Sequence, residues 1–351
     1  MAVSAQSGVF SFGPMAGKGG TPPNWYRHRA TMVDLSVLDE TREGPPEVGG
    51  IAVPTFPYKS GPLVAGGFTI MPRYQSSFGF LLYALMGNLN SGADPYNLDV
   101  YDHVYNLNPT DSTYVPYLNF RKHIPRKDNG VDTDLGEIYK DCKIVGGTLA
   151  LPNDMPLSLR LDVVGREFSL DHSPHSWTYA NTFEDWESIP VACQTGGYFN
   201  IGGETLPVVS GSVSWQNVPL DLRMERVYGD PYIEDVTVIQ RRLAYDIVVK
   251  WNNPALYAQV LGGGPTATGW SGKPHTASFE VKSVSSDNMP SETEPYSLTI
   301  AATEVMMSQV GGITLAGNNA VMLRFSGVAI DSAEYATITL RNKVASYTWP
   351  T

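Results

Sequence analysis

Apolar and polar residues alternate along much of the chain, and this pattern predicts a mainly β protein. In the segment 157–163 the leucine and valine side chains fall on one face, while Ser158, Arg160 and Asp162 fall on the other, as expected for a half-buried strand. Residues that favour turns separate this segment from its neighbours. Further strands are predicted at 148–151, 208–218, 236–251, 278–284, 297–305 and 320–330.

Two short segments interrupt this pattern and are typical of helices. The first, 77–86, begins at Ser77, which can cap a helix, and is followed by Gly87, a residue type common just after a helix end. The second, 254–261, begins with Pro254, which suits a first helical turn, and is followed by three glycines. One helix is therefore predicted in each half of the chain.

The predicted elements occur in the same order twice along the chain. Each half contains a strand, a long loop, a second strand, a helix and further strands, which favours an internal duplication. We therefore predict two tandem modules, residues 25–172 and 204–351, joined by a polar and aromatic linker at 173–203. Residues 1–24 precede the first module as an extended N-terminal arm.

The N-terminal arm is rich in small residues and carries a few large apolar side chains. It lacks the basic start and continuous apolar stretch of a secretory signal peptide. Two interpretations are open: a tail with little intrinsic order, or an arm that becomes ordered on a neighbouring subunit. Phe10, Phe12 and Met15 are the side chains that such an arm would bury.

The composition excludes several classes of protein. A length of 351 residues suits two domains better than one, and 42% hydrophobic residues exclude a disordered chain. A net charge of −11 argues against binding phosphates with a basic surface, and two cysteines cannot form a disulfide scaffold. No apolar run is long enough to predict a transmembrane helix. Only 17% of the residues are charged, below the usual level of about 25%, so partners are expected to cover part of the surface.

No group of residues in the sequence predicts an enzyme, a cofactor site or a metal site. His172 and His175 could be half of a metal site, but no further ligand cluster accompanies them. The glycine-rich segment 13–19 is too short for a phosphate loop and follows no predicted strand. The acidic segment 128–137 lacks the ligand spacing of a calcium-binding loop. A solvated polar loop explains the two histidines better than a metal site does. A solvated hairpin tip explains the acidic segment better than a calcium site does.

Two stretches resemble the major tail tube proteins of long-tailed, siphovirus-type bacteriophages. Residues 117–121 and 136–149 are similar to a strand, a Tyr-x-Asp/Gly-Cys-x-Val segment and a β-hairpin of that family, with Ile144 in place of the valine. Residues 201–217 resemble the start of the second module in the larger members, a short strand followed by Ser-x-Ser-x-x-x-x-Asn. The resemblance extends from about residue 24 to residue 347.

The resemblance implies two tandem β-sandwich or small-barrel modules, each flanked by one short α-helix. In the family, the inner sheets of a ring join edge to edge into one β-barrel around a channel, so that exposed strand edges become the assembly surfaces. Long loops brace the next subunit or ring, and the candidates here are about 39–59 and 222–234. Two modules in one chain favour a trimeric, pseudo-sixfold ring. A hexameric ring with an outer decorating domain is the alternative.

The implied function is a virion protein that polymerises into stacked rings and conducts genomic DNA without binding it tightly. An acidic lumen would repel phosphates, and the candidate lumen residues are Asp162, Glu167, Asp171, Asp331 and Glu334. The expected partners are further copies of the chain and the tape measure, tail terminator and tip proteins, with no membrane. The protein would be made and assembled in the bacterial cytoplasm.

Two other functions stay open from the sequence. The 19 tyrosines and the aromatic region 177–186 could serve a tail-tip or baseplate protein that binds receptors or glycans. A hydrolase without a recognisable catalytic motif is the third possibility. A tube protein predicts long polymers, whereas the tip protein predicts discrete particles.

Overall fold

A computed structural model describes most of the chain. The described residues are 7–39, 41–44, 56–128, 131–181, 186–192, 194–250, 254, 257, 258, 260, 266–269, 272, 275–309, 321–330 and 335–351. Most of them lie in β-strands, as the alternating pattern predicts. Up to residue 171 the elements are β1 (Val9–Pro14), β2 (Tyr26–Arg27), β3 (Ala30–Val33), β4 (Ser36–Leu38), β5 (Thr41–Glu43), β6 (Pro57–Lys59), β7 (Leu63–Ile70), α1 (Phe78–Met86), β8 (Asn88–Ala93), β9 (Tyr101–Asn106), β10 (Leu118–Ile124), β11 (Lys127–Asp128), β12 (Val131–Asp132), β13 (Leu135–Leu151), β14 (Ser158–Gly165) and β15 (Glu167–Asp171).

After two short 3-10 turns at Pro174–Ser176 and Trp186–Ser188, the described part of the chain again consists mainly of β-strands. Nineteen strands belong to one antiparallel sheet, and β5–β6 and β11–β12 form two separate ribbons. The remaining strands are β16 (Tyr198–Ile201), β17 (Glu204–Thr205), β18 (Val208–Pro219), β19 (Val238–Lys250), β20 (His275–Asn288), β21 (Pro295–Gln309), β22 (Met322–Ala329) and β23 (Thr337–Asn342).

The longest strand, β13, connects two parts of this sheet. Its first half pairs with β10 and β15, and its second half pairs with β14 and β18. The change occurs at Asp141, which has a left-handed φ of 51°, a conformation uncommon for residues other than glycine. The backbone N–H of Asp141 donates a 2.8 Å hydrogen bond to Asn119 Oδ1, which holds this bend. The upper part of the sheet has the order β2–β1–β10–β13–β15.

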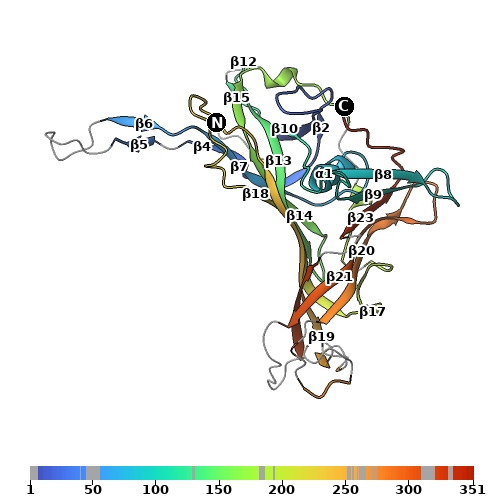
Figure 1. The fold of residues 1–351 in the computed structure, drawn as a ribbon. Helices are drawn as coiled ribbons and strands as arrows, with labels where there is room; N and C mark the ends of the chain where they lie inside the picture. The colour runs from blue at the N-terminus through green and yellow to red at the C-terminus, as the bar shows by residue number, and fades with distance from the viewer. Residues whose placement is uncertain are drawn as a thin grey trace.

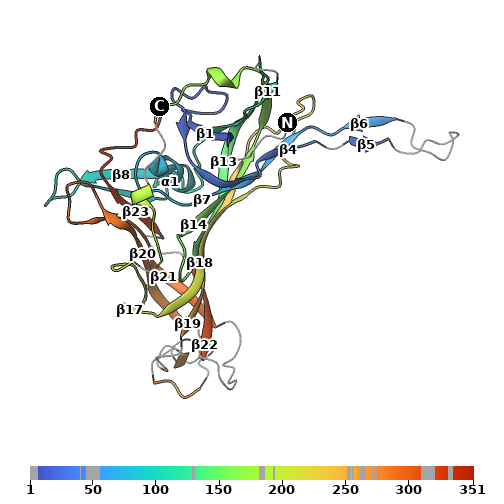
Figure 2. The same cartoon turned by 180° about the vertical axis from the view of Figure 1, so that it is seen from behind.

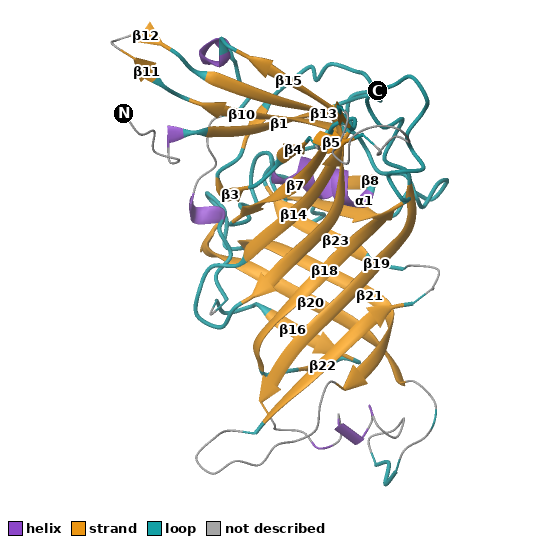
Figure 3. Cartoon of the chain, turned by 90° about the vertical axis from the view of Figure 1, so that its left-hand side faces the viewer, coloured by secondary structure: helices purple, strands orange, loops and turns teal. Residues whose placement is uncertain are grey.

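The larger part of the sheet runs through eight strands, in the order β4–β7–β14–β13–β18–β19–β22–β21. β21 is a second long strand that serves two neighbours, because its first half pairs with β23 and its second half with β22. Figure 3 shows the long strands of this sheet crossing the molecule obliquely, side by side. The larger of two apolar clusters among the described residues lies between this sheet and the layer of α1, β9, β20 and β23.

The helix α1 is where the sequence predicts it, within one residue. It ends at Gly87, whose φ of 93° allows its N–H to bond Tyr83 O at 2.8 Å. Nearly every residue of the helix is buried, and a Cβ at Gly79 would lie 2.3 Å from the ring of Tyr347. α1 is the one α-helix whose bounds the described residues give. The other helix expected at 254–261 lies mostly outside them.

The molecule has a compact body with two projections on opposite sides and long strands that extend from a third. Figures 1 and 2 show the β5–β6 ribbon projecting from the body on one side and the β8–β9 hairpin on the other. The first described strand, β1, and the C-terminal residues lie near the same end of the body (Figure 2). In the described part of the chain, no helix is long and apolar enough to cross a membrane.

Within the predicted N-terminal arm, Val9–Pro14 form β1, a strand of the chain's own sheet. β1 pairs with β10 along its whole length and with β2 at Ser11 and Phe12. Phe10, Phe12 and Met15 are buried within the chain, and Trp349 Nε1 donates a 2.8 Å hydrogen bond to Met15 O. The apolar surface expected to order on a neighbouring subunit is therefore already covered in this conformation.

Candidate assembly surfaces

The first candidate surface is the projecting ribbon of β5 and β6, which we call the hairpin arm (residues 39–62). Among the described residues, Thr41–Glu43 pairs only with Pro57–Lys59, in antiparallel register, so the ribbon has no strand partner in the main sheet. Phe56 and Tyr58 are exposed on it, with ring centroids 6.3 Å apart. Two adjacent exposed aromatic rings on a free ribbon are typical of a surface that a partner covers.

A second long loop connects β18 to β19, and it folds back onto the chain. This docked loop (residues 220–237) contacts the first half of the molecule through Asp235, which lies 3.1 Å from Lys143 Nζ. Tyr117 donates its hydroxyl proton to Asp235 at 2.7 Å, and Lys143 Nζ also donates to Val236 O at 3.0 Å. Of the two loops that the family resemblance suggested as braces, the hairpin arm is the one whose ribbon projects from the body, and at its base Arg226 of the docked loop donates a 2.7 Å hydrogen bond to Gly61 O.

The electrostatics of this contact favour a charged pair. The Lys143 side chain is 9% exposed, so its ammonium needs a counter-charge. Burial alone would raise the pKa of Asp235, but the hydrogen bond from Tyr117 and the Lys143 charge outweigh it and hold that pKa below its usual value. Burial and the bond to Asp235 raise the pKa of Tyr117, so its hydroxyl remains a donor.

Arg166 forms a second tie between the docked loop and the body. Its Nε donates to Ile233 O at 2.9 Å, and its guanidinium lies 3.4 Å from Asp230 and 3.6 Å from Asp141. Burial would lower the pKa of Arg166, but the carboxylates of Glu167, Asp230 and Asp141 raise it. The docked loop is thus held at two charged points and by the small apolar cluster around Ile233 and Val236.

The third candidate surface is the face of the eight-strand sheet that points away from the core, which we call the exposed face. Along β18 the inward positions carry Val213 and Trp215, whereas the outward ones carry Ser212, Ser214 and Gln216. The neighbouring strands follow the same alternation, so the face is lined mainly by small polar side chains. Its outward residues include Thr148, Ala150, Ser158, Ala244, Ser326 and Val328.

Several charges on the exposed face are paired, while Arg242 and Lys250 also lie at exposed outward positions of β19. Arg160 Nε donates to Asp162 at 2.8 Å, and its Nη2 lies 3.0 Å from Asp34. On the other half of the sheet, Arg324 binds Asp246 through two nitrogens at 2.6 and 2.7 Å. Exposed pairs of this kind add little to stability, but they reduce the charge that the face offers to an ionic partner.

The three described acidic residues predicted for the lumen do not lie together. Asp162 is on the exposed face, beside Arg160. Glu167 and Asp171 lie on β15 in the upper part of the sheet, where Glu167 pairs with Arg166, and Asp171 accepts hydrogen bonds from Ser173 N and Trp177 Nε1 at 2.8 Å. These two donors hold the pKa of Asp171 below its usual value. Asp331 and Glu334 lie outside the described residues.

The turn between β8 and β9 displays two exposed apolar side chains on a firmly held backbone. Tyr96 is 97% and Leu98 is 73% exposed. Asp94 accepts the N–H groups of Tyr96 and Asn97 at 2.7 and 3.1 Å, and these bonds, with the Arg341 charge, hold the pKa of Asp94 below its usual value. Arg341 also pairs with Asp102 and Glu294, at 3.0 and 2.6 Å.

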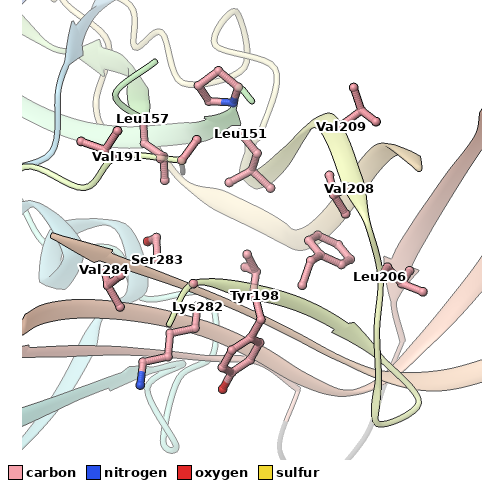
Figure 4. Close-up of a pocket in the computed structure, with 15 residues that line it drawn as sticks. Leu151, Leu157, Val191, Tyr198, Leu206, Val208, Val209, Lys282, Ser283 and Val284 are labelled. Carbon is pink, nitrogen blue, oxygen red and sulfur yellow. The ribbon is translucent and has the colours of Figure 1, made fainter. Parts of the chain in front are cut away.

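A cavity of about 180 Å³, lined mostly by aliphatic residues, lies between β13–β18 and β16–β20. Figure 4 shows aliphatic side chains on both walls, among them Leu151, Leu157 and Val208, while the ammonium of Lys282 points away from the cavity. The hydroxyl of Tyr198 is engaged by Glu280. This lining offers packing surface and brings no nucleophile and base together.

The described residues contain no group of three or more His, Cys, Asp or Glu residues that could hold a metal ion. Cys142 is a free, buried thiol whose pKa burial raises well above its usual value, which leaves it unreactive. Cys193 is outside the described residues.

Sequence reasoning did not single out Lys143, Asp235 or Arg341. A signal existed for Lys143, because a lysine inside an apolar strand is expected to be paired. Nothing in the sequence pointed to Asp235 as its partner.

Comparisons with known proteins place these surfaces in context. No curated protein matches the chain. The toluene transporter TodX of P. putida aligns with 11% identity over 97% of this chain and 88% of its own, with a TM-score of 0.08. A model of the phage tail tube protein family matches residues 7–329, which confirms the resemblance found in the sequence. The chain therefore belongs to the phage tail tube protein family.

Proposed function

We propose that this chain polymerises into rings that stack into a phage tail tube, through which DNA passes during ejection. Its family makes it a structural, non-enzymatic component of the phage tail that assembles with itself. The observation that best supports the ring is the eight-strand sheet, because it is a wide, curved wall with a polar face and open edges. Such edges are aggregation hazards in a monomer and become useful when each is covered by the next subunit.

Two modules per chain are supported by the connections within the eight-strand sheet. In the first four strands, β4 and β7 flank the hairpin arm, β13 and β14 form a hairpin, and β7 pairs with β14. In the last four, β18 and β19 flank the docked loop, β21 and β22 form a hairpin, and β19 pairs with β22. The proposed modules, 25–172 and 204–351, each contain one of these units.

Three chains per ring follow from this arrangement. Single-module members of the family close a ring with six modules, as the resemblance implies, and three chains of two modules supply the same number. The β13–β18 pairing then serves as one of the module junctions, and the contacts between chains serve as the others.

We propose the exposed face as the wall of the channel. Short Ser, Thr, Gly and Ala side chains leave the bore open, and pairing Arg160 and Arg324 with carboxylates limits binding of DNA phosphates. An acidic lumen stays a prediction. Asp162 is its one described candidate on this face, and Glu167 and Asp171 would contribute only if β15 also borders the channel.

The alternative function, a glycan-binding tip protein, rests on open aromatic platforms. Trp177 belongs to the aromatic region 177–186 named for it, but Arg121 covers its ring at 4.7 Å and its indole N–H is bonded to Asp171. Trp186 is exposed and remains usable for stacking.

Negative-stain electron microscopy of the purified chain tests the proposal against this alternative. We expect tubes of uniform width and open length, or a soluble form that converts to them on concentration. Discrete particles that never polymerise, together with retention on a glycan array, would favour the tip protein instead.

A further inference from the structure

The two halves of the eight-strand sheet meet at one strand pair, β13 and β18. Their antiparallel register places Gly146 opposite Gln216 and Gly147 opposite Trp215, and the pairing continues to Leu151. This internal junction joins the last strand of the first four-strand unit to the first strand of the second. It therefore shows how one unit docks on the next within a single chain.

The registers of the two units make their residues equivalent one by one. Ser36 pairs with Ala65 in the first unit, as Ser214 pairs with Ala244 in the second. Arg160 pairs with Thr69, as Arg324 pairs with Val248. The difference in residue number between equivalent positions of β7 and β19 is constant, because 244 minus 65 and 248 minus 69 both give 179. β7 and β19 are thus equivalent strands in matching register.

The same comparison locates the equivalents of the internal junction. Gly146 pairs with Asp162, and Ser308 pairs with Ser326, so Ser308 in β21 is equivalent to Gly146 in β13. Gln216 pairs with Arg242, and Leu38 pairs with Leu63. Leu38 in β4 is therefore equivalent to Gln216 in β18.

Both equivalent positions lie on open edges of the described sheet. β4 pairs with β7 on one side, and no described strand pairs with its other side. β20 covers β21 only as far as Met307, so that Ser308 and Gln309 have β22 as their one described neighbour. Leu38 and Ser308 are both exposed on the outward face, as Gln216 is at the internal junction.

We propose that β4 of one chain pairs antiparallel with the C-terminal end of β21 of a second copy, with Leu38 opposite Ser308 and Val37 opposite Gln309. The proposal rests on the ring described above and adds the strands and the register that close it. The Leu35 carbonyl already accepts the Tyr139 hydroxyl at 2.9 Å, so the edge available to the neighbour begins at Ser36. Each contact between chains would then repeat the internal junction.

Cysteine pairing tests this register directly. In the Leu38→Cys, Ser308→Cys double variant, assembled tubes should form covalent ladders of two and three chains under oxidation, because directly opposed residues lie within disulfide reach. The matched control is Leu38→Cys, Ser326→Cys. Ser326 faces the same way one strand further in, about 5 Å more distant, and it should give at least tenfold less cross-linked product.

Two further samples serve as references when the cross-linked products are separated by gel electrophoresis. The Thr148→Cys, Ser214→Cys variant places cysteines at a matching pair of the internal junction and should cross-link within one chain. The unsubstituted chain, run in parallel, reports any product of Cys142 and Cys193.

The outcomes separate this inference from the proposed function. Tubes that form without the 38–308 link, or that link 38 to 326 equally well, would overturn the register and leave the tube function intact. An absence of tubes from the unsubstituted chain would instead contradict the function itself.

Hydrogen exchange provides a second test that needs no substitution, in case the double variant fails to assemble. The exchange rates of peptides that contain Ser36–Leu38 and Ser308–Gln309 should be at least tenfold lower in the tube than in the soluble chain, because their amides gain hydrogen-bond partners. Unchanged exchange at both peptides in assembled tubes would contradict the pairing.

Discussion

Lys143 and Asp235 join segments that are 92 residues apart in the chain. Lys143 lies on β13 among apolar neighbours, and the ammonium is covered by the ring of Tyr117 at 4.3 Å. A buried charge is costly when it loses its partner. The Lys143 ammonium therefore requires the docked loop to be in place, although the pair itself adds little net stability. The contact holds the two halves of the chain in one arrangement.

Replacing Asp235 with asparagine should therefore destabilise the folded chain. The amide keeps the shape and can accept from Tyr117, but the Lys143 charge is left unpaired, and we expect a loss of about 1–3 kcal/mol. Urea unfolding of the unassembled chain measures it. Asp154→Asn is the matched control, since Asp154 is exposed, and equal stability of the two variants would contradict the role given to the pair.

The same residue predicts a dependence on pH. The pKa of Asp235 is lowered in the folded chain from an ordinary value of 3.8, so its contribution is complete above about pH 5 and is lost as the pH falls through the folded pKa. The stability difference between the unsubstituted chain and Asp235→Asn should be constant above about pH 5 and shrink as the pH falls from there to about pH 3. A difference that stays constant or grows over this range would show that the lowered pKa does not stabilise the fold.

At the scale of elements, local patterns predicted the strands and their faces well. The inward Leu159, Leu161 and Val163 of β14 are buried, as their alternation requires, and α1 ends at the expected glycine. The bend at which β13 changes its neighbouring strands was not predictable. It depends on the left-handed backbone of Asp141, which is held by the distant Asn119. Strand pairing between segments far apart in sequence leaves no local signature.

The N-terminal segment illustrates the limit of composition as a guide. Its many small residues suggested low order, but Phe10 and Phe12 alternate with smaller residues in the period of a strand. Phe10 packs against Phe68 and Phe120, at centroid distances of 4.8 and 5.7 Å. The apolar surface that favoured an arm on a neighbour is used instead to complete the chain's own core.

The hairpin arm carries a prediction at this scale. Replacing residues 40–58 with a short glycine-serine turn should leave the monomer folded, because β5 and β6 pair only with each other. We expect little change in the urea midpoint and a loss of long tubes in electron micrographs. The milder Phe56→Ser, Tyr58→Ser variant should weaken polymerisation in the same direction. Normal tubes from the deletion would exclude the arm as an assembly contact.

At the scale of the whole molecule, the two projections point in opposite directions (Figures 1 and 2). Contacts between unlike surfaces build rings or filaments, whereas a single self-complementary patch would stop at a dimer. The hairpin arm, the β8–β9 turn and the two open edges are all unlike surfaces. The low share of charged residues, 17%, agrees with a molecule that presents several surfaces to other copies of itself.

A cryo-electron microscopy reconstruction of the assembled tube tests the central claim most directly. We predict three chains in each ring, with Arg160 and Arg324 at equivalent heights on the channel wall and the exposed face turned toward the bore. Six full chains in a ring, or a tube whose bore is lined by another surface of the chain, would contradict the account.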